Sequence, residues 1–413
     1  MAGENGSGET MLRPRRSFLL VLLMLFGGAG FASGSLFAQV TGLPRAVVAD
    51  WTLLPDGTLK QGHAVLLAPD GTIERIVAVS DGSLPEPRWE GGPGSVITPG
   101  LHELLTELGA AGENYETFQP IDPEASMAAA LDPMRRDLEA ARRAGVLHAT
   151  SAPSPANPVS GCALTIATGS RTRLELIGDP SRARPLVCSV GESALDPNRE
   201  PTSRSGLRMV LERWLADSGR TLLADDARRR GAPPLVHCGE AMDVRLAVEL
   251  FSDRMPTLVL ASGARDAARL LARSGGGGGT PLVVGPFRAS TSIPELRAIP
   301  QLVAAGYELA FHGAMPGGGE HSLRATARRA VREGLDPAVA RRAMTSTPAR
   351  VAGVADQIGS LAPGLRADLV VFSGDPLLAS SRVLAVWQRG RRVSIDPPAA
   401  TPSALEPNRN GRN

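Results

Sequence analysis

The middle of the chain, residues 99–354, repeats one short unit many times, and this repetition constrains the fold more than any other feature. Each unit has a stretch of helical periodicity, then a glycine or polar turn, then a short apolar run. Examples are "DVRLAVELFSDRMPTLVLASG" and "PELRAIPQLVAAGYELAFHGAM". Strands separated by helices pair in parallel, and about 250 residues of such units suffice for an eight-stranded barrel. The pattern therefore predicts an α/β fold with a TIM-like (β/α)8 barrel, with an open doubly wound sheet as the alternative.

The segments on either side of this region are rich in strand and turn signals. Asp56-Gly57 and Asp70-Gly71 each separate two apolar runs, which is a strong hairpin signal. Residues 358–395 have the same character, with Pro-Gly and Ser-Gly-Asp-Pro turns. We predict that both ends of the chain build one small β-sandwich domain. The expected bounds are 39–98 plus 355–395 for this composite domain, 99–354 for the barrel and 396–413 for a disordered tail rich in Pro, Asn and Arg.

The amino terminus has the pattern of an export signal. Arg15-Arg16 precedes Ser17-Phe18-Leu19 and an apolar run that ends near Phe26, as in signals of the twin-arginine type. The apolar run is shorter than the ~20 residues of a membrane span. We therefore expect residues 1–38 to direct export to the periplasm or the outside of the cell, with an uncleaved membrane anchor as the alternative.

Composition excludes several classes of function. The net charge is +2, and no basic stripe is interleaved with aromatic residues, so we expect no nucleic-acid binding. No Gly-x-Gly-x-x-Gly follows the first strand of the barrel region, which argues against a dinucleotide site. The three cysteines match no zinc or redox spacing.

Four segments resemble the amidohydrolase superfamily, in particular its imidazolonepropionase-like and dihydroorotase-like members. They are "GSVITPGLHELLTELG" (94–109), "ARRAGVLHATSAPSPANPVSG" (141–161), "PLVHCGEAMDV" (234–244) and "TSTPARVAGVADQIGSLAPGLRADLVVFSGDPL" (345–377). The resemblance implies the barrel and the composite β domain predicted above. It also implies hydrolysis by a water molecule that one or two divalent metal ions activate at the carboxy-terminal ends of the strands.

Most of the metal ligands that the resemblance implies are replaced. The two positions of the family's His-x-His pair hold Leu105 and Glu107, whereas His237 matches a family histidine. Ser262 stands where the next histidine is expected, and the final aspartate falls on His312 or Gly313. A carbamylated lysine is also excluded, because the one lysine of the chain lies in the β domain. Two surviving ligands do not hold a catalytic zinc ion, which normally needs about three protein groups.

A metal site rebuilt from neighbouring residues is the alternative. Its candidate ligands are His237, Glu107, His312 and His148. We expect six further residues to line the pocket, namely His102, Glu103, Leu105, Glu240, Ser262 and Gly313. Cys238 is a poor partner for His237, because adjacent residues of a strand point to opposite faces.

Two classes of function follow from these observations. The first is an exported, amidohydrolase-like protein without catalysis, which needs no cofactor and acts by binding a small molecule or as the partner of an active homologue. The second is a divergent hydrolase of carbon–nitrogen bonds with one zinc or other divalent ion. The sequence leaves open whether the protein is an enzyme. Association into homo-oligomers is also compatible with either class, and membrane contact is expected only through the amino-terminal segment.

Overall fold

A computed structural model describes most of the chain between residues 45 and 395. The described ranges are 45–112, 114–169, 173–179, 184–219, 232–251, 256–260, 264–273, 277–319 and 321–395. The expected export segment, the expected tail and Ser262 lie outside these ranges. Within them, no helix has both the length and the apolar character needed to cross a lipid bilayer.

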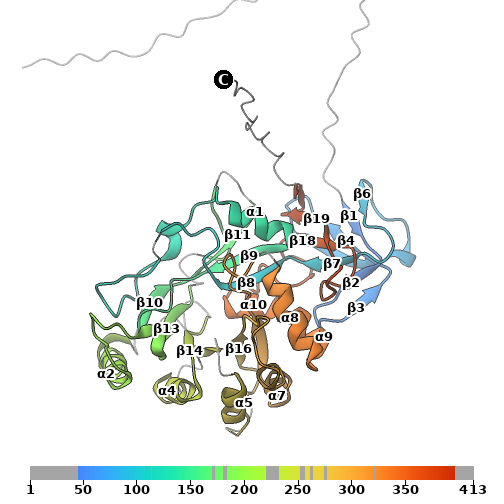
Figure 1. Cartoon of the computed structure of the whole chain (residues 1–413). Helices are drawn as coiled ribbons and strands as arrows, with labels where there is room; N and C mark the ends of the chain where they lie inside the picture. Colours follow the sequence, from blue (N-terminus) through green and yellow to red (C-terminus); the bar gives the residue numbers. More distant parts are fainter. Residues whose placement is uncertain are drawn as a thin grey trace, which may run out of the picture. The chain divides into compact units, whose positions relative to one another are not determined.

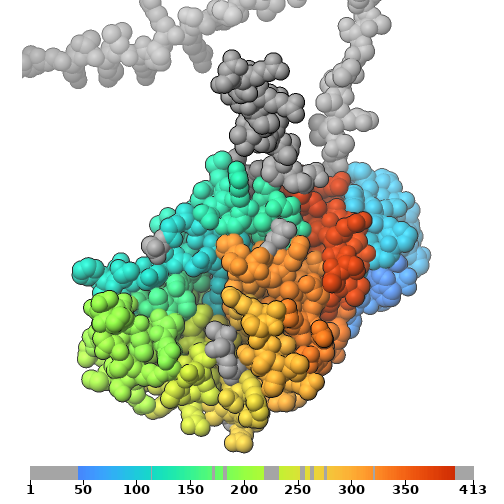
Figure 2. Space-filling model, in the orientation of Figure 1, coloured from blue at the N-terminus to red at the C-terminus, as the bar shows by residue number. Residues whose placement is uncertain are grey.

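Two sheets form the β domain, and strands from both ends of the chain pair in one of them. The first sheet has the order β5-β4-β1-β6, and the second has the order β20-β19-β18-β7-β2-β3. Strand β18 (Leu369–Phe372) pairs antiparallel with β7 (Val96–Pro99), so the carboxy-terminal segment lies beside the amino-terminal strands (Figures 1 and 2). The other strands are β1 (Ala46–Val48), β2 (Trp51–Leu53), β3 (Leu59–Gln61), β4 (His63–Leu67), β5 (Ile73–Ala78), β6 (Arg88–Glu90), β19 (Val383–Gln388) and β20 (Arg391–Val393). The predicted composite domain is therefore confirmed.

The Asp-Gly turns form the expected hairpins. Strand β2 pairs with β3 across the first turn, and β4 pairs with β5 across the second. Gly57 and Gly71 both have a φ of 87°, a left-handed conformation that glycine adopts without a steric penalty. The core of the domain is anchored by Trp387, which is fully buried and meets Trp89 edge-to-face at 4.9 Å between ring centroids.

The barrel wall is built from strands that follow one another along the chain. They are β8 (Leu101–Thr106), β9 (Val146–Ser151), β10 (Val159–Cys162), β11 (Leu164–Ala167), β13 (Leu186–Ser189), β14 (Leu235–Cys238), β15 (Thr257–Leu260), β16 (Pro281–Val284) and β17 (Glu308–Phe311), and the short strand β12 (Glu175–Leu176) pairs antiparallel with β11. Strands β13 to β17 pair in parallel, as predicted, and so do β8 and β9.

The third position of the wall differs from the expectation of parallel strands. Strands β10 and β11 are separated by Ala163 alone, and they run antiparallel to β13 and β9 respectively. Between the last and first strands, Phe311 N donates to the carbonyl of Ala343 and His102 N donates to that of Met344. The fold is thus the predicted TIM-like barrel, with one position of the wall reversed.

Helices cover the outer face of the barrel (Figure 1). They are α1 (Arg136–Arg143), α2 (Arg204–Trp214), α4 (Ala241–Phe251), α5 (Ala264–Arg273), α6 (Ile293–Leu296), α7 (Ala298–Ala304), α8 (Ser322–Arg332) and α9 (Pro337–Arg342), with short turns η1 (Val79–Asp81), η2 (Met127–Ala130), η3 (Glu192–Ala194) and η4 (Leu215–Gly219), whereas α10 (Ser346–Val351) packs on the interior of the barrel. Their apolar faces join the outward side chains of the strands in one large cluster, which includes Phe251, Leu271 and Cys238. Burying this apolar area supplies the main driving force for the fold.

A second cluster fills the interior of the barrel. It contains Leu235, Val259, Val283 and Ala310 from four successive strands, and it includes no residue of helices α1 to α9. Helix α10 adds Val351 to this cluster at the end of the barrel where the strands begin. The interior of the barrel is therefore a packed apolar core, as in TIM barrels generally.

Candidate functional site

Two histidines meet inside the carboxy-terminal end of the barrel. His237 pairs in register with Val259, which belongs to the interior cluster, so its side chain faces inward. His312 follows the end of β17 and is 8% exposed. Burial and the nearby His312 lower the pKa of His237 to about 3, and burial lowers the pKa of His312 to about 4. Both imidazoles are therefore neutral at pH 7, although a backbone hydrogen bond at Gly285 opposes part of the lowering of the His312 pKa.

The side chains at the family's His-x-His positions diverge. Leu105 has a φ of 51°, which is strained for a branched side chain, and it packs partly buried against the interior cluster. Glu107 is exposed, and its Oε1 accepts a hydrogen bond of 3.0 Å from Asn114 Nδ2 in the following loop. The reversal of the backbone at Leu105 thus separates two positions that regular alternation would place on one side.

The neighbours of these positions, His102 and Glu103, are fully buried and have structural partners. His102 Nε2 lies 2.7 Å from Thr150 Oγ1. Glu103 Oε1 accepts a hydrogen bond of 2.6 Å from the backbone N of Gly313, and this bond ties β8 to the end of β17. Burial raises the pKa of Glu103 to about 8, although the N–H groups of residues 313 to 315 oppose the shift.

His148 belongs to a buried charge network rather than to the His237–His312 pair. Its Nε2 lies 2.9 Å from Asp368 Oδ2, and both side chains are 1% exposed. Asp368 also accepts hydrogen bonds from Arg366 Nε at 2.8 Å and from Arg389 N at 2.7 Å. Glu175 completes the network by accepting from both arginines. This network joins the barrel to the β domain, and nothing in the sequence pattern around Asp368 had marked it as the partner of His148.

The remaining candidates are dispersed. Glu240 is exposed and pairs with Arg204 at 3.3 Å. Gly313 lines a cavity on the outer side of the barrel end, together with Arg288 and Arg329. Cys238 points into the outer cluster, as predicted from strand alternation, and all three cysteines are buried and form no disulfide.

Among the described residues, the barrel end offers fewer donors than a catalytic metal ion needs. In the described ranges, no group of three or more His, Cys, Asp or Glu side chains is arranged to hold one. His237 and His312 supply two imidazoles, whereas Glu107 and His148 are bound to other partners. A catalytic zinc needs about three protein ligands together with a water molecule.

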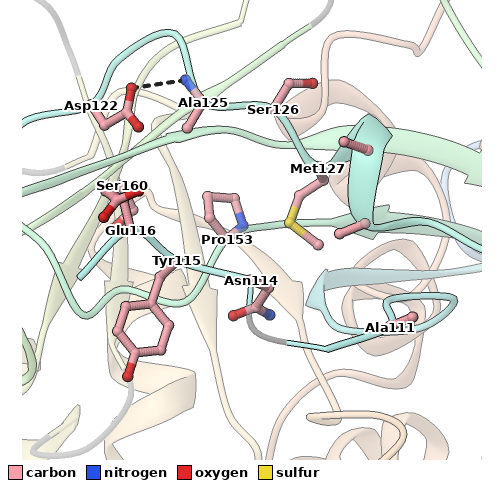
Figure 3. A pocket seen from close by; sticks show the side chains of 12 residues that line it. Ala111, Asn114, Tyr115, Glu116, Asp122, Ala125, Ser126, Met127, Pro153 and Ser160 are labelled. Carbon is pink, nitrogen blue, oxygen red and sulfur yellow. Dashed lines mark hydrogen bonds between the residues drawn. The ribbon is translucent and has the colours of Figure 1, made fainter. Parts of the chain in front are cut away.

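A cavity of about 360 Å³ opens beside this end of the barrel, where β8 and β9 finish (Figure 3). The loop after β8 forms most of its wall, with the side chains of Tyr115, Glu116, Asp122 and Met127. Pro153 lies across from them, and Asp122 Oδ1 accepts a hydrogen bond of 3.2 Å from Ala125 N. The described residues of the wall contribute two carboxyl groups and no basic side chain, so the cavity suits a neutral or cationic small molecule.

Comparison with known proteins agrees with this architecture. The sequence model of the Amidohydrolase family matches residues 258–409. An amidohydrolase from Thermotoga maritima MSB8 superposes with a TM-score of 0.69 at 22% identity, over 84% of this chain and 99% of that chain. Residues 258–409 thus match the Amidohydrolase family, and the fold of the chain is the amidohydrolase fold.

Two other amidohydrolase-fold structures are similar at lower identity. A prolidase complexed with N-methylphosphonate-L-proline has a TM-score of 0.56 at 17% identity, over 84% of this chain and 99% of that one. An adenosine deaminase from Xanthomonas campestris with bound zinc has a TM-score of 0.50 at 16% identity, over 84% and 92% respectively. No protein of curated function matches the sequence significantly. The likeness to both structures is one of fold.

Proposed function

We propose that this amidohydrolase-superfamily protein is exported and binds a small molecule without hydrolysing it. The single observation that carries the proposal is the position of Leu105, whose side chain packs on the interior core where the family's first metal-binding histidine is expected. The paired arginines before a short apolar run support export. The cavities at the carboxy-terminal end of the barrel support a binding role, because ligands of this fold bind there.

Hydrolysis of a carbon–nitrogen bond in this fold requires a water molecule that a metal ion polarises. When bound, such an ion lowers the pKa of its water and stabilises the developing oxyanion. His237 and His312 can offer two nitrogen lone pairs to a cation, but Leu105 has no donor atom. Glu103 is committed to the backbone of Gly313. The chain therefore retains the binding part of the fold and has lost the groups that activate water.

A divergent hydrolase with one metal ion remains the second candidate function. It is favoured by His312, because this buried imidazole lies near the imidazole of His237 and a neutral imidazole can offer a lone pair to a metal ion. A catalytic zinc ion would need a third protein ligand beside these two.

Metal content and hydrolysis distinguish these functions. We expect the purified full chain to hold less than a stoichiometric amount of zinc, and to hydrolyse Xaa-Pro dipeptides and cyclic amides no faster than a matched His237→Ala/His312→Ala variant. The variant controls for a trace contaminant, because a contaminating hydrolase would be unaffected by it. One bound ion per chain, together with a rate that falls in the variant, would reverse the proposal in favour of the hydrolase.

Restoring the lost pair is expected to fail. A Leu105→His/Glu107→His variant should gain no hydrolysis and no stoichiometric zinc, because residue 105 has a left-handed backbone and residue 107 faces the solvent. The two new imidazoles would not converge on His237. Inductively coupled plasma analysis and the same substrate panel check this result. Tight zinc binding by the variant would show that the backbone at residue 105 adapts, contrary to this expectation.

A further inference from the structure

The cavity that Gly313 lines lies where the last two strands of the barrel end. Its volume is about 330 Å³. The loop after β16 contributes Pro286, Phe287 and Arg288, and the loop after β17 contributes glycines 313, 317 and 318. The first two turns of α8 close it with Ser322, Ala325, Thr326 and Arg329. This cavity is lined by different residues from the one in Figure 3, and it has the opposite charge.

Two guanidinium groups give the cavity its charge. Arg288 is exposed and Arg329 is half-buried, and among the described residues no carboxyl group lines the cavity. Neither arginine forms an ion pair within the part of the chain that the structure describes. Burial lowers the pKa of the neighbouring Arg328, and the positive charge of Arg329 lowers it further. A half-buried guanidinium beside a like charge is unfavourable by itself, so an anion in the cavity would relieve it.

The uncharged groups of the cavity are also donors. The hydroxyl oxygen of Ser322 is buried and has no hydrogen-bond partner in the described structure. Thr326 Oγ1 accepts a hydrogen bond of 3.2 Å from Phe287 N, which leaves its own proton available. A Cβ atom at Gly313 would lie 2.5 Å from the backbone N of Leu323, in the first turn of α8. Only glycine allows this approach, and the first-turn N–H groups of a helix lack acceptors within the helix.

We propose that this cavity binds the phosphoryl group of a small organic phosphate. Two guanidinium groups, two hydroxyl groups and a helix amino terminus offer more donors than the two oxygens of a carboxylate can accept, and a phosphate monoester has three terminal oxygens. The apolar side chains of Pro286, Phe287 and Ala325 leave room for an organic substituent. This inference extends the binding role proposed above, and it does not depend on whether the barrel hydrolyses its ligand.

Calorimetric titration of the full chain with phenyl phosphate tests the site. We expect saturable one-to-one binding, weakened at least about tenfold by Arg329→Gln, since a charge-assisted hydrogen bond contributes about 1.5–3 kcal/mol. Arg288→Gln should also weaken binding. Because Arg288 is exposed, this variant is expected to fold and can replace Arg329→Gln if that variant does not. Arg332→Gln is the matched control, because Arg332 carries the same charge on the same helix and lies outside the cavity.

The outcomes separate this inference from the proposed function. Equal weakening by Arg332→Gln, absence of phenyl phosphate binding, or equally tight binding of phenylacetate would each overturn the phosphoryl site. Inorganic phosphate should bind more weakly than phenyl phosphate, and the reverse order would contradict a role for the apolar wall. Hydrolysis of amide substrates by a chain that binds phenyl phosphate would refute the inactive barrel while leaving this site intact.

Discussion

Replacing Asp368 with asparagine is expected to lower the free energy of unfolding by about 3 kcal/mol at pH 7, the low end of the cost of breaking a buried ion pair. The carboxylate is 2% exposed and accepts hydrogen bonds from His148, from Arg366 and from the backbone of Arg389. The variant keeps the size of the side chain but leaves the Arg366 guanidinium without its buried counter-charge. Urea unfolding at equilibrium measures the difference.

The pH dependence gives this prediction a second test. Although burial favours the neutral form, His148, Arg366 and the Arg389 N–H lower the pKa of Asp368 from 3.8 to about 2. Its stabilising contribution is therefore complete above about pH 4 and is lost as the pH falls towards 2, which amounts to about 2 kcal/mol. The loss should be absent in the Asp368→Asn variant.

Glu175→Gln is the matched control for this network. Its side chain is 30% exposed and pairs with the same arginine, so we expect a loss below about 1 kcal/mol, as for other ion pairs that reach the solvent. If both variants lose the same amount, the buried position of Asp368 is not the cause.

Replacing Glu103 with glutamine is expected to stabilise the protein at alkaline pH. The pKa of Glu103 is raised from 4.5 to about 8 by burial, so the folded chain holds a proton there that the unfolded chain has released. Stability should therefore fall as the pH rises from about 4.5 to 8, and the shift corresponds to several kcal/mol at about 1.4 kcal/mol per unit. Glutamine keeps the acceptor for Gly313 N and never ionises.

Urea unfolding of both proteins at pH 5 and pH 9 measures this effect. The comparison must be between wild type and Glu103→Gln at each pH, because the buried histidines act in the opposite direction. His237 and His312 have lowered pKa values, so they destabilise the fold as the pH falls below about 6.5. If the variant gains no stability relative to wild type between pH 5 and pH 9, the N–H groups of residues 313 to 315 hold Glu103 ionised.

Local patterns were enough to predict the architecture. The Asp-Gly turns at residues 56–57 and 70–71 fix hairpins, because few other dipeptides accept the left-handed backbone they need. The alternation of helix and strand in residues 99–354 predicts the barrel, because each helix or strand is recognised from the periodicity of its own residues. The reversed strand of residues 159–167 escaped prediction, since the direction of a strand depends on its neighbours and not on its own side chains.

The candidate site was predicted less completely. Replacement of the His-x-His positions by Leu105 and Glu107 was visible in the sequence, and so was the match of His237 to a family histidine. The sequence could not show that His148 pairs with Asp368, a residue 220 positions away. No sequence pattern marked Arg288, Ser322 or Arg329 as binding residues, because single arginines and serines occur on every protein surface.

The sequence by itself determined which donor atoms the barrel end can contain, because a leucine has no lone pair wherever it lies. Tertiary structure decided which of the remaining donors meet. His237 and His312 lie on different strands whose ends converge only in the folded barrel, and Glu107 is turned away by a single left-handed residue before it. Covalent identity is a local property, whereas convergence of side chains depends on register, backbone conformation and the packing of segments that are distant along the chain.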